Sequence, residues 1–302
     1  HRMDAKFIVL QLLNSISYGC VLFMIASGFS LIFGLMKITN MTHLVYFMIG
    51  SYVSYTVCVW SGSFLLGMIA AAAVTSLIGY IVFKGFLFRL RGEGQSQVLL
   101  CLGFLFILDD ALLAIFGGYP KSTPTPEWLS GSIKFLDFTF PKYRLFLIVV
   151  GVLIAVALNL LINKTKYGAL IRSGVDDAET VQAMGININH LFVVVYVGAT
   201  FLAAIGGTLG GPFLSMEPKM SFTLLPIALA IVIIGGMGNL NGAFYGSLVV
   251  ATIDNFCKVL APSLSYFSIF LPTALILVFK PEGLFTRGTR KVKREKRGVL
   301  KR

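Results

Sequence analysis

Charged residues are scarce in this chain of 302 residues. Asp, Glu, Lys and Arg together make up 13% of it, whereas hydrophobic residues make up 57%. Soluble globular proteins have about 25% charged and roughly 45–50% apolar residues. Apolar runs of roughly 20 residues, the length that crosses a bilayer as a helix, recur along the sequence. These proportions exclude an ordinary soluble domain and indicate an integral membrane protein.

Cysteine is also rare, and its placement argues against two classes of site. All four cysteines lie in apolar runs and no pair has C-x-x-C spacing: Cys20, Cys58, Cys101 and Cys257. We therefore expect small buried residues with free thiols, and neither a disulfide framework nor a metal site. No short apolar run is followed by a small-residue cleavage site, so we expect no removable signal peptide.

Sequence motifs for nucleotide binding and hydrolysis are missing. The dipeptide Gly-Lys never occurs, which excludes a Walker A phosphate loop. Neither H-E-x-x-H nor G-x-S-x-G is present. We therefore predict that the chain is not an enzyme and binds no cofactor itself. If ATP drives its activity, another subunit must bind the ATP and its magnesium ion.

The apolar runs predict an all-α membrane protein with a bundle of about 8–10 transmembrane helices in a single domain, residues 1–302. We count nine apolar segments, with an uncertainty of one: 7–36, 44–60, 64–88, 98–116, 145–162, 191–214, 221–234, 243–260 and 265–279. Nine spans with a cytoplasmic C-terminus place the N-terminus outside, and ten place it inside. The sequence leaves both arrangements open.

Positive charge is concentrated at the C-terminus. The formal net charge is +12, and residues 287–302 contain nine Lys or Arg and one Glu. The positive-inside rule predicts that this basic tail is cytoplasmic, and an additional role in binding anionic lipid headgroups stays open. The tail lacks interleaved aromatics, which argues against nucleic-acid binding. The proline-rich segment 119–144 has mixed charge, and we place it outside.

The polar segment 164–190 interrupts the apolar runs and carries a short helical pattern. Asp176 or Asp177 can cap a helix by accepting hydrogen bonds from free backbone N–H groups. Val181 and Met184 follow Ala178 at spacings of three, which predicts one face of an amphipathic helix. Gly185 stands where a left-handed glycine commonly ends a helix. A short helix that lies in water between two membrane spans offers a surface to which another protein can bind.

Two further segments combine asparagine with helix-weakening residues, and each is a candidate break in a membrane helix. They are 38–43 and 235–242. Broken helices in transporters expose backbone groups that bind polar solutes. The candidate pathway residues are Asn40, Thr42, His43, Gly235, Gly236, Gly238 and Asn239. The alternatives are an ordinary interhelical loop with His43 as a structural hydrogen-bonding residue, and a tight cytoplasmic turn.

Carboxylates within apolar runs are costly and need a partner. Asp109 and Asp110 could line a path or relay protons, or they could lie near the outer interface and be satisfied by a neighbouring loop. Asp254 and Lys258 are four residues apart on a helix, which predicts an ion pair with a structural role.

Small residues recur every four positions in two of the runs, a spacing that lets helices approach closely in lipid. The first set is Gly67, Ala71, Thr75 and Gly79, and the second is Ala199, Ala203, Gly207 and Gly211.

Three motifs in order resemble LivH-type permeases, the membrane subunits of branched-chain amino acid ABC importers. Residues 27–43 (Ser-Gly-Phe-Ser-Leu-Ile-Phe-Gly-Leu-Met-Lys-Ile-Thr-Asn-Met-Thr-His) with 48–53 resemble the first membrane region. Residues 233–246 (Ile-Ile-Gly-Gly-Met-Gly-Asn-Leu-Asn-Gly-Ala-Phe-Tyr-Gly) resemble the glycine-rich segment. Residues 177–186 (Asp-Ala-Glu-Thr-Val-Gln-Ala-Met-Gly-Ile) resemble the cytoplasmic loop that contacts the ATPases. The chain departs from the family pattern at Leu44, where glycine is common, and at Gly174, where a better helix former is usual.

The resemblance implies a multi-pass subunit of the bacterial cytoplasmic (inner) membrane. Its expected partners are a second permease subunit, two ATPase subunits, an extracytoplasmic binding protein and membrane lipids. The ATPase-coupling residues would be Asp176, Asp177, Ala178, Glu179, Met184 and Gly185. The expected solute is a branched-chain or other hydrophobic amino acid, urea or a short amide. The alternative is a self-sufficient secondary transporter or channel, in which Asp109 and Asp110 couple to ions.

Overall fold

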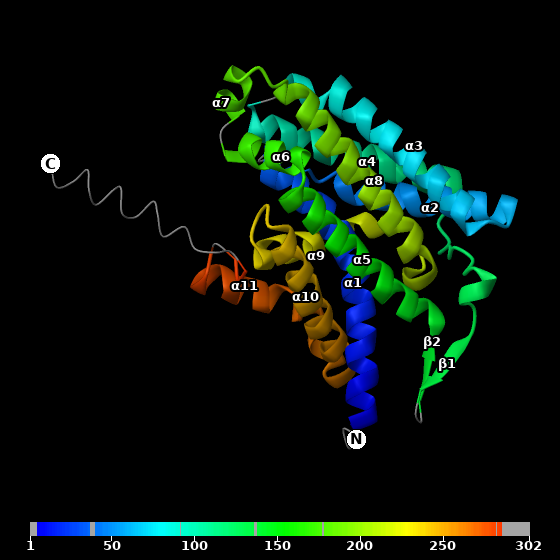
Figure 1. The fold of residues 1–302 in the computed structure, drawn as a ribbon. Coiled ribbons are helices and arrows are strands. Elements are labelled where there is room, and N and C mark those ends of the chain that lie inside the picture. Colours follow the sequence, from blue (N-terminus) through cyan, green and yellow to red (C-terminus); the bar gives the residue numbers. More distant parts are fainter. Residues whose placement is uncertain are drawn as a thin grey trace.

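A computed structural model describes residues 5–36, 40–90, 92–135, 138–176, 178–281 and 283–285. Helices dominate this part of the chain (Figure 1). They are α1 (Ala5–Met36), α2 (His43–Ser61), α3 (Phe64–Gly85), α4 (Gly94–Phe116), α5 (Lys142–Lys164), α6 (Lys166–Asp176), α7 (Ala178–Ala183), α8 (Ile188–Leu214), α9 (Met220–Gly235), α10 (Leu240–Leu260) and α11 (Phe270–Phe279). Short 3-10 helices cover Leu87–Leu90, Glu127–Leu129 and Pro262–Phe267, and one antiparallel hairpin joins β1 (Ser132–Phe135) to β2 (Phe138–Pro141).

Within the described residues, seven helices are long and apolar enough to cross a membrane: α1, α2, α3, α4, α5, α8 and α10. Two shorter apolar helices, α9 and α11, are present as well. The prediction of an all-α polytopic membrane protein is therefore confirmed. The long first run forms the single helix α1.

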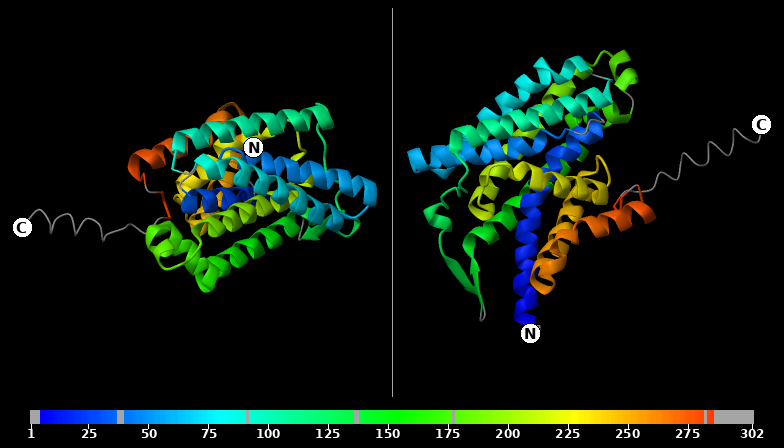
Figure 2. Two further views of the ribbon diagram at one scale, coloured as in Figure 1. Left: turned by 90° about the horizontal axis from the view of Figure 1, so that it is seen from above. Right: turned by 180° about the vertical axis from the view of Figure 1, so that it is seen from behind.

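The bundle has two ends, which we name the α6 end and the hairpin end after the elements they carry (Figures 1 and 2). α1 begins at the hairpin end, where the Arg144 side chain, just after β2, donates to Asn14 of α1. The last described residues lie at the other end, because the Leu284 N–H donates to the Ile234 carbonyl at 2.8 Å, beside the last turn of α9. The first and last described residues thus lie at opposite ends of the bundle.

α1 forms the centre of the bundle and contacts α5, α8, α9 and α10. Three of its four buried serines, Ser15, Ser17 and Ser27, donate to carbonyls of the preceding turn, whereas the Ser30 hydroxyl has no partner among the described residues. The Ser15 hydroxyl donates to the Gln11 carbonyl at 2.7 Å, and the Ser27 hydroxyl donates to the Met24 carbonyl at 3.0 Å. Such bonds to the preceding turn let a helix carry hydroxyls through hydrocarbon at low cost.

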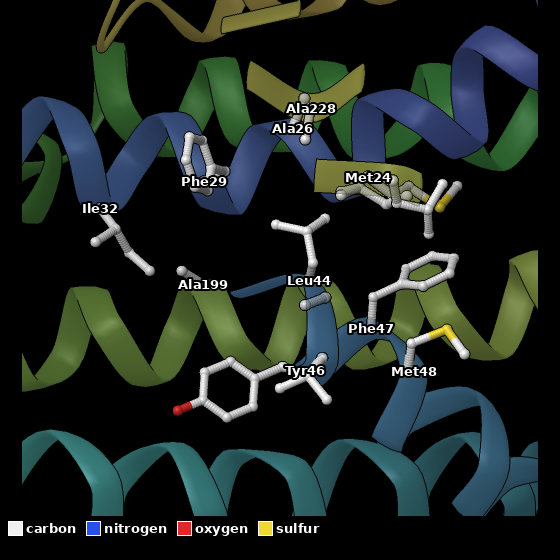
Figure 3. Close-up of a cluster of buried hydrophobic side chains, with 14 of the residues drawn as sticks. Met24, Ala26, Phe29, Ile32, Leu44, Tyr46, Phe47, Met48, Ala199 and Ala228 are labelled. Atoms are coloured by element: carbon white, nitrogen blue, oxygen red, sulfur yellow. The ribbon is translucent and has the colours of Figure 1, made fainter. Parts of the chain in front are cut away.

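The core lies where α1, the first turns of α2, and α8 meet. Figure 3 shows Leu44 and Phe47 of α2 close to Met24 and Phe29 of α1 and to Ala199 of α8, and all five are buried. Around this core, α4 and α5 direct many large apolar side chains outward, for example Ile107 and Leu153, which are 63% and 61% exposed. In lipid, outward apolar side chains are what a peripheral membrane helix requires.

Both predicted small-residue stripes form close helix contacts. Gly67 of α3 packs on the Ser54 carbonyl of α2, and Gly207 of α8 packs on the Phe47 carbonyl, also of α2. A methyl group at Gly207 would lie 2.0 Å from that carbonyl oxygen, so only glycine allows this approach. The stripes therefore set the spacing of α2 against α3 and α8, as expected from their period.

Candidate functional site

The polar segment between α5 and α8 folds into two short helices, α6 and α7. The sequence had indicated only one helix, near 176–185, so α6 is an addition. α6 begins because the Thr165 hydroxyl accepts a hydrogen bond from the Gly168 N–H at 3.0 Å. Its Leu170 and Ile171 pack against the hydrophobic core. α6 is thus held to the bundle by a cap and an apolar face.

The end of α7 confirms the prediction for Gly185. This residue has φ +83°, and its N–H donates to the Gln182 carbonyl at 3.0 Å. The Ile186 N–H reaches back to the Val181 carbonyl at 3.4 Å. These two bonds around a left-handed residue form a Schellman motif, in which glycine is favoured because it has no Cβ. The motif sets the direction in which the chain enters α8.

The predicted shared face of α7 is only partly present. Val181 is 4% exposed and belongs to the core, whereas Met184 is 74% exposed. Met184 lies beyond Ala183, the last residue of α7, so the helical spacing no longer applies to it. Asp177 and the side chains of Asp176, Ala178 and Glu179 lie outside the described part, and their capping and coupling roles stay predictions.

The glycine-rich segment forms a tight turn between α9 and α10 at the α6 end. Gly236 and Gly238 have φ +92° and +78°, a region that disfavours other residues. The Asn239 side chain accepts from the Gly242 N–H at 3.1 Å and caps α10. A Cβ on Gly34 of α1 would lie 2.6 Å from the Gly238 Cα, so the two backbones are in contact. These features favour the tight-turn interpretation over a broken transmembrane helix.

A cavity of about 310 Å³ joins this turn to α6. Its walls come from α1, α5, α6 and the turn. It is lined by the Asn159, Asn163 and Asn241 amides, the Arg172 guanidinium and Ser30. The structure therefore places predicted pathway residues Gly238 and Asn239 beside the predicted coupling segment.

The polar residues of the described connection between α1 and α2 are buried. The exposed fraction is at most 1% for each of Asn40, Thr42 and His43. The Thr42 hydroxyl donates to the Cys101 carbonyl of α4 at 2.9 Å, and His43 Nε2 donates to the Ile25 carbonyl of α1 at 3.2 Å. Asn40 Nδ2 and His43 Nδ1 have no hydrogen-bond partner among the described residues. Two polar groups are thus left free inside the bundle, while Ile38 and Thr39 lie outside the described part.

Both sets of predicted pathway residues pack against α1. The His43 ring lies against Gly28, and Gly238 lies against Gly34. Six residues of helix separate the two contact points, which corresponds to a rise of about 9 Å.

The acidic pair in α4 has partners at the hairpin end. The Ser221 hydroxyl donates to the Asp109 carboxylate, which is buried. The exposed Asp110 pairs with Lys219 at 3.4 Å. Lys219, in the connection between α8 and α9, thus pairs with Asp110, and Ser221 of α9 donates to one oxygen of Asp109. Asp109 Oδ1 has no partner among the described residues. The interface alternative is therefore favoured for Asp110, and both interpretations stay open for Asp109.

A second polar cluster, at the hairpin end, was not singled out from the sequence. The predicted Asp254–Lys258 pair is present, with an N···O distance of 2.6 Å. Arg144 and Asn14 lie near it and line the same cavity. Their only sequence signal is polarity at the edge of apolar runs. Among the described residues, no group of three His, Cys, Asp or Glu side chains is placed to hold a metal ion.

One known protein family matches nearly the whole length of this bundle. The family described as the permease component of branched-chain amino acid transport systems matches residues 11–279. The chain belongs to this family. The match begins within α1 and ends at the last residue of α11.

Individual members of the permease family are distant relatives. The high-affinity branched-chain amino acid transport permease BraD of Pseudomonas aeruginosa is 26% identical over 92% of this chain and 95% of its own length. The permease LivH of Escherichia coli is 22% identical with the same coverage. The xylose/arabinose import permease XylH of Sulfolobus acidocaldarius is 25% identical over 61% of this chain and 51% of its own. No solved structure matches the chain significantly.

Proposed function

We propose that this chain is the membrane-spanning permease subunit of an ATP-driven ABC importer in the bacterial cytoplasmic membrane. It pairs with a second permease, identical or related. Two ATPase subunits bind at the α6 end and use ATP and magnesium, and an extracytoplasmic binding protein delivers the solute at the hairpin end. The chain itself performs translocation and no covalent chemistry. Membership of the permease family supports this assignment.

The proposal rests on the exposed apolar side chains beside the short helices at the α6 end. Two short capped helices stand between long apolar ones, and apolar side chains remain exposed beside them. Tyr167 is 72%, Met184 74% and Met237 57% exposed. A monomeric protein gains nothing from exposed apolar side chains on a polar surface, whereas a partner subunit can bury them. Of the predicted coupling residues, Met184 and Gly185 are described, and both lie at the end of α7 beside this surface.

The same end is proposed to be cytoplasmic. Residues 283–285 lie there, and the sequence continues directly into the basic tail, 287–302. Under the positive-inside rule, a basic segment next to a membrane helix stays in the cytoplasm. The hairpin end, with the proline-rich segment 119–144, then faces outward, where Trp128 (67% exposed) and Tyr119 (85% exposed) offer contacts for a binding protein.

The coupling mechanism needs a bundle with two packing states. ATP-bound ATPases prefer one state, and the free energy of that preference moves the bundle. The 164–190 segment contacts α1 and α8 through α6 and α7. The same α1 carries the contacts to Asn40–His43 and to the glycine turn, so movement at the α6 end changes the surroundings of both predicted pathway segments.

The solute is proposed to be a branched-chain or other hydrophobic amino acid. BraD and LivH are permeases of branched-chain amino acid systems, and the sugar permease XylH is a shorter match. The free Asn40 and His43 groups can hydrogen-bond a passing polar solute.

Reconstitution in proteoliposomes tests this function. Concentrative leucine uptake is expected only when the ATPases face the vesicle lumen, ATP is enclosed in the lumen, and leucine-loaded binding protein is present outside. Uptake by the permease alone, driven by an ion gradient, would instead establish a secondary carrier. A charge reversal at Glu179 should lower uptake per ATP hydrolysed. The matched reversal Glu217→Lys, on an exposed residue at the hairpin end, should leave that ratio unchanged.

A further inference from the structure

A cavity of about 470 Å³ opens at the hairpin end between α1, α5, α8, α9 and α10. Its volume lies within the range of roughly 300–1,000 Å³ that is typical of small-molecule sites. One wall is apolar and includes Met220, Leu224 and Ile227. The polar part of the lining, which we call the polar wall, carries Arg144 and Lys258. The cavity is therefore amphipathic.

The polar wall has an excess of positive charge. Lys258 pairs with Asp254 at 2.6 Å, so these two charges compensate each other. Arg144 donates to the neutral Asn14 side chain and lies over the Phe213 ring at 5.2 Å. Among the ion pairs of the described residues, none includes Arg144.

Arg144 is held in place before any ligand arrives. Its partner Asn14 also donates to Gln11 at 3.4 Å. The neighbouring Asn255 donates to the Gln11 carbonyl at 3.2 Å and to the Ser15 hydroxyl at 3.0 Å. This network fixes the polar wall with neutral groups and leaves the guanidinium charge uncompensated. Arg144 lies half-buried in the first turn of α5 at the mouth of the cavity, where its charge can meet an anionic ligand.

A planar guanidinium recognises a carboxylate through two parallel hydrogen bonds. We propose that this cavity binds the solute on its way into the membrane, with Arg144 holding the carboxylate and the α9 wall holding the apolar side chain. This inference rests on the proposed importer function and deepens it. It assigns the solute to carboxylates with an apolar group and argues against urea and short neutral amides.

Transport measurements on the assembled importer test the role of Arg144. With leucine-loaded binding protein in excess, Arg144→Gln should lower the maximal uptake rate about tenfold or more, as expected for loss of a charge-assisted contact. Arg144→Lys should restore part of the rate because it keeps the charge. The matched control Lys142→Gln removes the same charge from the same helix, two residues away, outside the cavity, and should transport normally. Wild-type uptake by Arg144→Gln would overturn the proposal.

Cysteine labelling tests the site even if Arg144→Gln does not transport. Thr223 of α9 lines the cavity, and Cys257 is the one native cysteine of the chain that is not buried. The test variant is Thr223→Cys in a Cys257→Ser background, labelled with an anionic or a cationic methanethiosulfonate. Each labelling rate is divided by the rate at which that reagent reacts with free mercaptoethanol. The corrected rate should be higher for the anionic reagent. Arg144→Gln should remove this preference. Millimolar leucine should slow the labelling, and leucinamide should not.

The outcomes separate this proposal from the importer function. Equal corrected rates for the two reagents, or no protection by leucine, would remove the site while ATP-dependent uptake still supports the importer. Absence of ATP-dependent uptake by the wild-type assembly would instead remove the importer function. The anion preference of the cavity is measured in either case.

Discussion

Replacing Gly185 with alanine tests how much one left-handed backbone conformation contributes to the coupling of ATP hydrolysis to transport. Gly185 has φ +83°, and no atom lies within 4 Å of the position that a Cβ would occupy. The added methyl group therefore meets open space, and the cost is conformational alone. Holding an L-residue in the left-handed region costs about 1–2 kcal/mol. This free energy opposes the Schellman motif at the end of α7.

A cost of this size has a measurable effect on the population of the closed motif. About 1–2 kcal/mol corresponds to a factor of roughly 5–30 in an equilibrium constant. The amide hydrogens of Gly185 and Ile186, which donate to α7 carbonyls, should exchange faster by a similar factor. Hydrogen-exchange mass spectrometry of a peptide covering 181–187 measures this change. In reconstituted vesicles, uptake per ATP hydrolysed should fall in parallel.

Gly62, at the end of α2, offers a matched control away from the α6 end. Gly62 also has a left-handed φ, +69°, and open space at its Cβ position. Gly62→Ala should impose the same local strain at the end of α2 and leave coupling intact. Gly185→Asn should be milder than alanine, because asparagine tolerates the left-handed region. If Gly185→Ala and Gly62→Ala change coupling equally, or if neither changes exchange, the reasoning is refuted.

Three further outcomes follow from packing and hydrogen bonding. Gly207→Ala places a methyl group 2.0 Å from the Phe47 carbonyl and should lower the Tm in detergent, with an overpacking cost of about 3 kcal/mol. Gly198→Ala on the same helix meets open space and should not lower the Tm. Thr42→Val removes the side-chain hydrogen bond to the Cys101 carbonyl of α4 and should destabilise the protein by about 0.5–1.5 kcal/mol in denaturant titration. Asp110→Asn removes an exposed ion pair and should change stability by at most about 1 kcal/mol.

Local features of the fold could be predicted from the sequence because their causes are local. The spans follow from the length of the apolar runs, and the end of α7 follows from the conformational freedom of Gly185. The contacts of Gly67 and Gly207 follow from a four-residue period that places small residues on one helix face. α6 was missed because its apolar face is short and two glycines, Gly168 and Gly174, weaken its helical pattern.

The pairing of distant polar groups could not be predicted in this way. Asp109 finds its donor in Ser221, 112 residues away, and no local pattern indicates that partner. Arg144 was placed in the loop because the apolar run begins at the next residue. The helix begins earlier, after Pro141, and places the guanidinium on the wall of the cavity at the hairpin end.

The contact between Gly34 and Gly238 has a mechanical consequence. A side chain between two helices can change rotamer and absorb a small shift, but two main chains in direct contact have no such freedom. Any displacement of the 236–239 turn by a bound protein must therefore shift the end of α1 by a similar distance. The longest described helix is in this way tied to the surface at which a motor subunit would act.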